Sequence, residues 1–267
     1  MTPDLDGRVA LITGGTRGIG LATGLALAEH GAGVVLTHAW GSVPDEEVAA
    51  RFRERRLRPP LVIQADVGRA EDTVALLGQL ARQVEHVDVF VSNASTATAP
   101  RSLQDYDERA LLQSISRGAW PLVAYARGLR DTFGVWPRHL VAISSDGPDA
   151  FSFRYDFAAA AKSVLETLVR YLSWHLRDEN VTINAIRSRA VRTASFEAQF
   201  GGRLVETAAR YASEDRFVEA EDVADAVVGL CSGLMDAVNG QVLTVDRGTA
   251  FDDNLMRLFD ARRVIPG

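Results

Sequence analysis

Short apolar runs alternate with helix-like segments along most of the chain. The runs are rich in valine and isoleucine, and polar residues or glycines bound each of them. They lie at residues 8–13, 33–38, 60–64, 87–92, 138–144, 181–186 and 240–245. Between them, apolar residues recur at i, i+3, i+4 and i+7, the period of a helix. This alternation predicts one α/β domain over 1–267, with a doubly wound parallel sheet of seven strands covered by helices on both faces.

Composition narrows the environment and the partners. No apolar run approaches the about 18 residues of a membrane span, and the first residues lack the pattern of a secretory signal. The single cysteine, Cys231, cannot form an internal disulfide, which fits a reducing compartment. The net charge of −6 argues against nucleic acid, and the five histidines show no metal-ligand spacing. We therefore expect a cytoplasmic protein with no metal, membrane or nucleic-acid partner.

The segment "VALITGGTRGIG" at 9–20 reads as a strand followed by a glycine turn and the start of a helix. Gly14, Gly18 and Gly20 stand where a backbone turns tightly and can approach a pyrophosphate. The following helix would direct free N–H groups and a partial positive charge at those phosphates. Between the first strand and first helix of a βαβ unit, this pattern predicts a Rossmann-type dinucleotide site. A tight turn without a ligand is the alternative.

The end of the second strand bears on which dinucleotide binds. A cofactor with a free ribose 2′-hydroxyl usually meets an acid there, but this chain has His38, Ala39 and Trp40. Arg17 lies within the glycine turn, where a guanidinium can meet a 2′-phosphate. This combination favours NADPH, unless Arg17 is only an exposed loop residue. Asp66 is expected either to accept from the adenine amino group or to start the next helix.

The stretches "TGGTRGIG", "ADV", "VSNAS", "ISS", "TINAI" and "GQVLTVDRG" occur in this order along the chain. Together they resemble the motif set of the short-chain dehydrogenase/reductases over residues 7–248. The resemblance implies a dinucleotide-binding catalytic domain. It implies a cofactor site formed by Gly14, Thr16, Arg17, Gly18, Ile19, Gly20, His38, Asp66, Val67, Asn93, Ala94, Lys162 and Thr193.

The tyrosine of the common family pattern is missing. Most members carry Tyr-x3-Lys with a serine thirteen residues before the tyrosine, and both Lys162, the only lysine, and Ser145 point to position 158, which is alanine. Tyr155 instead gives Tyr-x6-Lys, which resembles the NADPH-dependent enoyl-[acyl-carrier-protein] reductases. This resemblance implies catalytic roles for Tyr155, Lys162 and Ser145, with Lys162 binding the nicotinamide ribose and lowering the pKa of Tyr155. Ser145 is expected to bind substrate or to cap the strand end.

Other positions depart from the common pattern. Ser116 replaces the asparagine that steadies a relay water, Ser92 replaces the first asparagine of Asn-Asn-Ala-Gly, and Ser188-Arg189 replaces Pro-Gly. The proton relay of the common branch is therefore expected to be absent. Pro148 and the mixed run after it predict that the helix carrying Lys162 begins near Asp156.

These features favour an NADPH-dependent reductase of an enoyl thioester, linked to an acyl carrier protein or coenzyme A. A ketoreductase or alcohol dehydrogenase of polyketide or other specialised metabolism is the alternative, and a catalytically impaired cofactor-binding protein is the second. The segment 189–217 is expected to form a substrate lid, with Arg189, Arg192 and Arg203 available to an anionic carrier. The helix at 157–176 is apolar around most of its circumference, which predicts a homotetramer, or at least a dimer.

Overall fold

The computed structural model describes residues 4–40, 43–194, 196 and 217–251. Within these residues the chain forms a parallel sheet of seven strands in the order β3-β2-β1-β4-β5-β6-β7. The strands are β1 (Val9–Ile12), β2 (Gly33–His38), β3 (Leu61–Gln64), β4 (Val89–Ser92), β5 (His139–Ser145), β6 (Thr182–Ser188) and β7 (Val242–Val245). The predicted Rossmann-type sheet is confirmed, and each strand falls within a predicted run or ends one or two residues beyond it.

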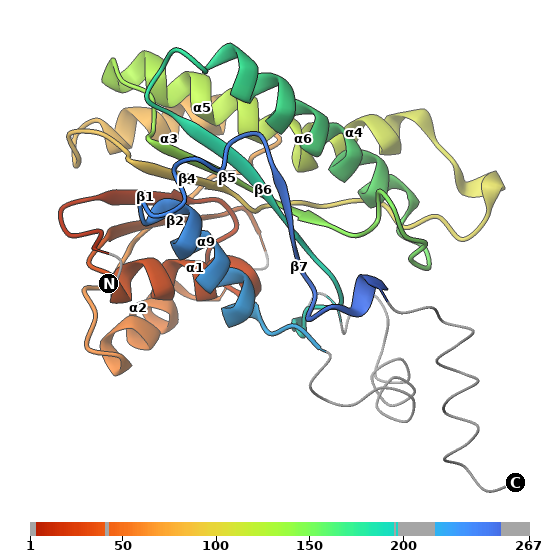
Figure 1. Ribbon diagram of the computed structural model, residues 1–267, viewed down its shortest axis with the longest axis horizontal. Helices are drawn as coiled ribbons and strands as arrows, with labels where there is room; N and C mark the ends of the chain where they lie inside the picture. Colours follow the sequence, from red (N-terminus) through yellow and green to blue (C-terminus); the bar gives the residue numbers. More distant parts are fainter. Residues whose placement is uncertain (1–3, 41–42, 195, 197–216, 252–267) are drawn as a thin grey trace, which may run out of the picture.

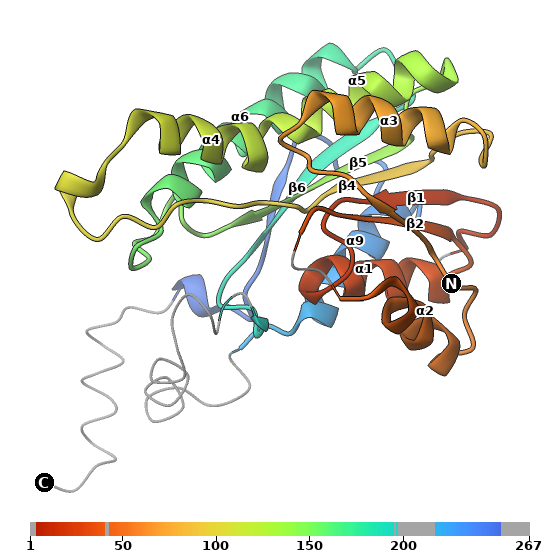
Figure 2. The same ribbon diagram turned by 180° about the vertical axis from the view of Figure 1, so that it is seen from behind.

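Helices cover the sheet on both sides (Figures 1 and 2). One layer contains α1 (Gly18–Glu29), α2 (Asp45–Glu54) and α9 (Ala220–Cys231). The other contains α3 (Ala70–Leu80), α4 (Glu108–Gly118), α5 (Trp120–Phe133) and α6 (Asp156–His175). Two short 3-10 helices, η1 (Leu103–Asp105) and η3 (Thr249–Phe251), lie in connections. The first residue of α6 is Asp156, as the sequence predicts.

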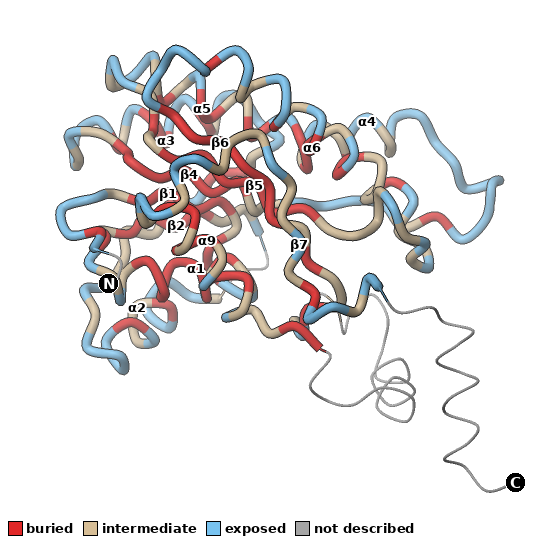
Figure 3. Tube along the Cα trace, viewed as in Figure 1, coloured by how far each residue is buried: buried red, intermediate tan, exposed pale blue. Residues whose placement is uncertain are grey.

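The strands are buried on both faces, as a sheet between two helix layers requires. Figure 3 shows the burial concentrated along the central strands and the inner sides of the helices. Alternate residues of β1 enter different clusters: Ala10 and Ile12 pack towards α1 and α9, whereas Leu11 packs towards α3 and α5. In the part of the chain that the structure describes, no helix is long and apolar enough to span a membrane.

The strand order reverses beside β1, which pairs with β2 on one side and β4 on the other. The connections from β1 and β4 therefore leave in opposite directions, and a crevice opens between them at the carboxyl ends of the strands. The glycine turn follows β1 and Asn93 follows β4 at this edge. The serine-ended strands β5 and β6 reach the same edge. The fold thus brings the predicted cofactor and catalytic residues to one side of the molecule.

Candidate active site

The glycine turn depends on glycine at each predicted position, for two different reasons. Gly14 and Gly18 have φ values of +64° and +52°, a region that side chains disfavour. At Gly20, an added Cβ would lie only 2.2 Å from the carbonyl oxygen of Gly14. Gly20 therefore permits the helix to pack against the turn, and the other two permit the turn itself.

Asn93 braces this turn from the neighbouring strand. Its Nδ2 donates to the carbonyl oxygens of Thr13 at 2.9 Å and Gly14 at 3.0 Å. The hydroxyl oxygen of Thr13 accepts from the backbone N–H groups of Asn93 at 3.0 Å and Ala94 at 3.1 Å. The amide side chain of Asn93 therefore fixes the turn. Thr13, its partner, was not predicted from the sequence.

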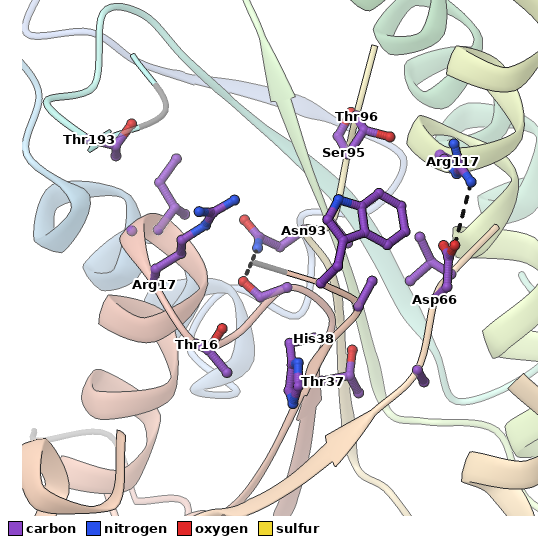
Figure 4. A pocket seen from close by; sticks show the side chains of 18 of the residues that line it. Thr16, Arg17, Thr37, His38, Asp66, Asn93, Ser95, Thr96, Arg117 and Thr193 are labelled. Atoms are coloured by element: carbon purple, nitrogen blue, oxygen red, sulfur yellow. Dashed lines mark hydrogen bonds and ion pairs between the residues drawn. The ribbon is translucent and has the colours of Figure 1, made fainter. Parts of the chain in front are cut away.

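A cavity of about 260 Å³ lies beside the turn, at the N-terminus of α1. Figure 4 shows Thr16 and Arg17 on one side of it and Asp66 and Arg117 on the other. All the predicted cofactor residues line this cavity except Gly20 and Lys162. The sequence did not assign a further set of lining residues: Thr37, Ala39, Trp40, Ala65, Ser95, Thr96, Arg117 and Ala194. Most of these additional residues are sequence neighbours of predicted ones, and that was the only feature of the sequence that indicated them.

The charges around the cavity are unequally distributed. Arg17 and Arg117 both line it, and Asp66 is the only acid among its described lining residues. His38 Nε2 lies 3.6 Å from Asp45 Oδ1, so an acid from α2 stands near the end of β2 without lining the cavity. An electropositive cavity at a helix N-terminus, with tight backbone approach at glycines, fits the phosphates of a dinucleotide.

Asp66 makes contacts that neither sequence interpretation anticipated. Its Oδ1 accepts from the backbone N–H of Gly68 at 2.9 Å, and its Oδ2 lies 3.4 Å from Arg117 Nη2. The helix that follows, α3, has Arg69 at its N-cap, so Asp66 does not occupy the capping position. Asp66 fixes the turn before α3 and holds the guanidinium of Arg117.

Tyr155 occupies the N-cap position of α6. Its ring packs on the backbone of Gly147, where an added Cβ would come within 2.8 Å of two ring carbons. Burial raises the pKa of Tyr155, and the nearby hydroxyl of Ser145 lowers it by a smaller amount. Ser145 Oγ is itself buried and makes no hydrogen bond within the described residues. The tyrosine and serine therefore lie together at the carboxyl end of β5.

Lys162 lies behind this pair, between α6 and β5. Its Nζ donates to the carbonyl oxygen of Ile143 at 2.7 Å, and only 5% of the residue is exposed. Burial lowers the pKa of Lys162 to about 8, while the carboxylate of Glu166 opposes that change. The prediction that Lys162 lowers the pKa of Tyr155 is wrong for this structure. The Lys162 ammonium points to β5, and burial of the phenol has the largest effect on the pKa of Tyr155.

A buried ion-pair network adjoins Lys162. Arg187 of β6 donates from Nε and Nη2 to the two carboxylate oxygens of Glu166, at 3.0 and 2.6 Å. Ser144 Oγ donates to Glu166 at 2.7 Å, and Arg187 also pairs with Asp149. The ion pair with Glu166, ahead of that with Asp149, raises the pKa of Arg187. This network was not predicted from the sequence, although an arginine directly after the apolar run 181–186 was a signal that Arg187 needed a buried partner.

Two arginines of the predicted lid have partners in the described residues. Arg189 Nε lies 3.1 Å from Asp146 Oδ2, and its Nη1 donates to the carbonyl oxygen of Thr249. Arg192 lies 3.6 Å from Glu219 and 4.6 Å from the ring centroid of Phe217. Each of these arginines therefore has an acidic partner within the fold, and its contact with an anionic carrier stays a prediction. Arg203 and most of the lid, residues 195 and 197–216, lie outside the described residues.

The family positions that this chain replaces with serine differ in their surroundings. Ser116 is exposed on α4, so its hydroxyl is not directed into the interior beside Lys162. Ser92 is buried at the end of β4, and Ser188 is buried at the end of β6. Among the described residues, no group of three His, Cys, Asp or Glu side chains is arranged to hold a metal ion.

This geometry agrees with the comparisons to known proteins. The family described as Enoyl-(Acyl carrier protein) reductase matches residues 14–250 of the chain. The protein is a short-chain dehydrogenase/reductase. It is therefore an oxidoreductase, a reductase of the type that uses a nicotinamide cofactor.

Individual relatives span nearly the whole chain. Versicolorin reductase 1 of Aspergillus parasiticus is 28% identical over 260 residues, covering 91% of this chain and 97% of its own. The enoyl-[acyl-carrier-protein] reductase [NADH] of Aquifex aeolicus is 28% identical over 250 residues, covering 91% and 92%. The structure of a short-chain dehydrogenase from Burkholderia cenocepacia in complex with NADP has a TM-score of 0.80 and 24% identity, covering 92% and 99%.

Proposed function

We propose that this protein is an NADPH-dependent reductase of the C=C bond of an enoyl thioester, with Tyr155 as the group that stabilises the enolate. The observation that carries the proposal is the position of Tyr155. Its phenol stands beside Ser145, at the end of β5 and ahead of Lys162, while the position of the common family tyrosine is Ala158. Alanine has no proton to donate, so Tyr155 is the acid available.

The spacing has a chemical reason. In a ketoreductase the acid must stand beside the oxygen of the carbon that receives hydride. In an enoyl thioester, hydride arrives at the β-carbon, and negative charge develops on a carbonyl oxygen two bonds further along. When bound, the cofactor supplies a hydride to the β-carbon. The resulting enolate is then protonated at its α-carbon by Tyr155 or water. A donor displaced towards the start of α6 fits the more distant oxygen.

The raised pKa of Tyr155 supports a donor role. Because burial favours the neutral phenol, Tyr155 keeps its proton at neutral pH and can donate a hydrogen bond to a developing oxyanion. Ser145, whose buried hydroxyl lies beside the phenol of Tyr155, is placed to act as a second donor to the same oxygen. Lys162 would contact the nicotinamide ribose after releasing the carbonyl oxygen of Ile143, and its compact ammonium suits two adjacent hydroxyls.

NADPH is the proposed cofactor for a separate reason. Arg17 lines the cavity, and the strand-end positions 38–40 carry no acid to receive a free 2′-hydroxyl. Gly14, Thr16, Gly18, Ile19, Val67, Ala94 and Thr193 would surround the dinucleotide with Asn93 bracing the turn.

The test is NADPH oxidation with paired crotonyl and acetoacetyl thioesters. We expect turnover of the crotonyl thioester, and Tyr155→Phe should lower kcat by about 10²–10⁴-fold while cofactor affinity changes little. Ala158→Tyr is the control that restores the common arrangement. If only the acetoacetyl thioester reacts, the enoyl assignment falls in favour of ketone reduction. If neither reacts although NADPH binds, a catalytically impaired protein remains.

Ketone reduction in polyketide or other specialised metabolism is the second candidate. The similarity to versicolorin reductase 1, at 28% identity across almost the whole chain, favours it. On this alternative Tyr155, or a substrate-held water, would protonate the alkoxide oxygen directly, and Tyr155→Phe would impair the acetoacetyl reaction instead.

We also propose that the protein assembles through the layer that contains α4 and α6, which pack side by side. Phe157, Leu165 and Val169 bury one side of α6, yet Tyr171 and Trp174 remain 66% and 64% exposed. Such large apolar side chains on an outer face are typical of an interface. We expect light scattering at micromolar concentration to report a homotetramer, or at least a dimer, and a monomer would contradict the proposal.

A further inference from the structure

The far side of the cofactor cavity from Arg17 carries a contact between an aromatic ring and a cation. The guanidinium carbon of Arg117 lies 5.3 Å from the ring centroid of Trp40, within the range of a cation–π interaction. Trp40 follows β2 and Arg117 lies in the last turn of α4, and both line the cavity. The pair therefore joins the two elements that flank the cavity at this end.

Arg117 is positioned by contacts with Asp66 and Gly68. Asp66 Oδ2 pairs with its Nη2 at 3.4 Å, and Asp66 is itself anchored by the backbone N–H of Gly68. A Cβ on Gly68 would lie 2.7 Å from Arg117 Nε and 2.9 Å from its Cγ. The side chain of Arg117 therefore passes over Gly68, where any larger residue would displace it. Asp66 offsets part of the positive charge of Arg117. Figure 4 shows this pair on the opposite side of the cavity from Arg17.

We propose that Trp40 and Arg117 form a clamp that takes the adenine ring between the indole and the guanidinium, with Asp66 and Gly68 positioning the arginine. The clamp deepens the proposed cofactor binding and rests on it. Purines stack on both tryptophan rings and guanidinium planes. The pairing of Arg117 with Asp66 suits a stacking surface better than a phosphate ligand, and leaves the phosphate to Arg17.

The ring has room to enter. A flat ring between two others needs a separation of about 7 Å, twice a contact distance of about 3.5 Å. The present 5.3 Å must therefore widen by about 2 Å. Trp40 is 59% exposed, so its outward movement displaces few protein contacts. The direct contact between Trp40 and Arg117 is exchanged for two stacking contacts with the base.

A clamp for adenine makes a different prediction from a site for the 2′-phosphate. NADPH and NADH share the adenine, so Trp40→Ala and Arg117→Ala should each weaken both cofactors by about tenfold, leaving their ratio unchanged. Reduced nicotinamide mononucleotide, which lacks adenine, should bind the variants and the wild type equally. Gly68→Ala should act in the same direction as Arg117→Ala, because it displaces the arginine without touching the cofactor.

The experiment is calorimetric titration of the full chain with NADPH, NADH, adenosine 2′,5′-bisphosphate and reduced nicotinamide mononucleotide, supported by tryptophan fluorescence. Adenosine 2′,5′-bisphosphate should quench the wild type, and Trp40→Phe should lose that quench while keeping its affinity within about threefold. Arg177→Ala is the matched control, since Arg177 lies over Trp174 at 4.4 Å, outside the cavity lining. It should change no affinity.

Two results would overturn the clamp. Unchanged binding of adenosine 2′,5′-bisphosphate to Trp40→Ala and Arg117→Ala would remove the stacking role. A loss confined to NADPH would instead make Arg117 a phosphate ligand. Wild-type protein that binds neither NADPH nor NADH would sink the proposed function together with the clamp, whereas wild-type binding with unaffected variants would sink the clamp alone.

Discussion

The glycine turn and the segment around Tyr155 lie at the same edge of the sheet, but different parts of the chain build them. The turn is held largely through backbone groups: Asn93 donates to the carbonyl oxygens of Thr13 and Gly14, and Gly20 packs against the same carbonyl of Gly14. The segment before Tyr155 is held by charged side chains at the end of β6 and just after it, since Arg187 pairs with Asp149 and Arg189 pairs with Asp146.

This difference explains why the two regions were predicted with different success. The residues of the turn must be glycine, or a small hydrogen-bonding side chain, to satisfy local geometry, so their order in the sequence is informative. The partners of Arg187 and Arg189 come from α6, the connection after β5 and η3, which are distant in the sequence, and many arrangements would satisfy an arginine. Arg189, which departs from the family pattern, binds Asp146 and the carbonyl oxygen of Thr249, and these partners could not be identified from the sequence around it.

The largest expected effect concerns the charged network. Arg187→Met should lower the free energy of unfolding by about 3–5 kcal/mol, because it leaves the buried carboxylate of Glu166 without its bidentate partner. Urea unfolding followed by circular dichroism measures this. Arg177→Ala removes an exposed ion pair with Asp178 and should cost at most about 1 kcal/mol. Equal costs for the two variants would show that the network does not support the Tyr155 segment.

The glycine turn should respond through binding. Gly20→Ala forces a Cβ to within 2.2 Å of the carbonyl oxygen of Gly14, so the turn must shift away from the phosphates. We expect NADPH affinity to fall by at least about 100-fold, close to 2.7 kcal/mol, measured by calorimetry. Gly78→Ala on α3 meets no atom within 4 Å, and should leave binding intact while adding about 0.5–1 kcal/mol of stability. Normal NADPH binding by Gly20→Ala would refute the backbone account.

Lys162 links pH to stability in the Tyr155 region. Its pKa is about 8 in the folded protein, below the ordinary lysine value, so between pH 8 and about 10 the unfolded chain binds the additional proton. Stability should therefore rise with pH in this window, by at most about 1.4 kcal/mol for each pH unit. The measurement is the difference in unfolding free energy between wild type and Lys162→Met. A difference that is flat or falls with pH would contradict the burial of the charged lysine.

The smallest expected effect separates the two arginines of the cofactor cavity. NADPH should bind the wild type at least about tenfold more tightly than NADH, or about 1.4 kcal/mol. Arg17→Ala should reduce that ratio towards one, because it removes the cation proposed for the 2′-phosphate. Fluorescence titration of both cofactors provides the measurement, with Arg117→Ala as the variant that should keep the ratio. Equal affinities in the wild type would refute the NADPH assignment.

The sequence alone determined the order of strands and helices, the glycine turn and the start of α6 at Asp156, since these follow from local periodicity and backbone requirements. It also predicted Tyr155 and Lys162 as site residues from their spacing at the start of α6. Only the tertiary structure decided where the Lys162 ammonium points, that burial raises the pKa of Tyr155 where Lys162 was predicted to lower it, and that Trp40 meets Arg117. Those outcomes depend on burial and on partners from separate elements, which no pattern along a single segment contains.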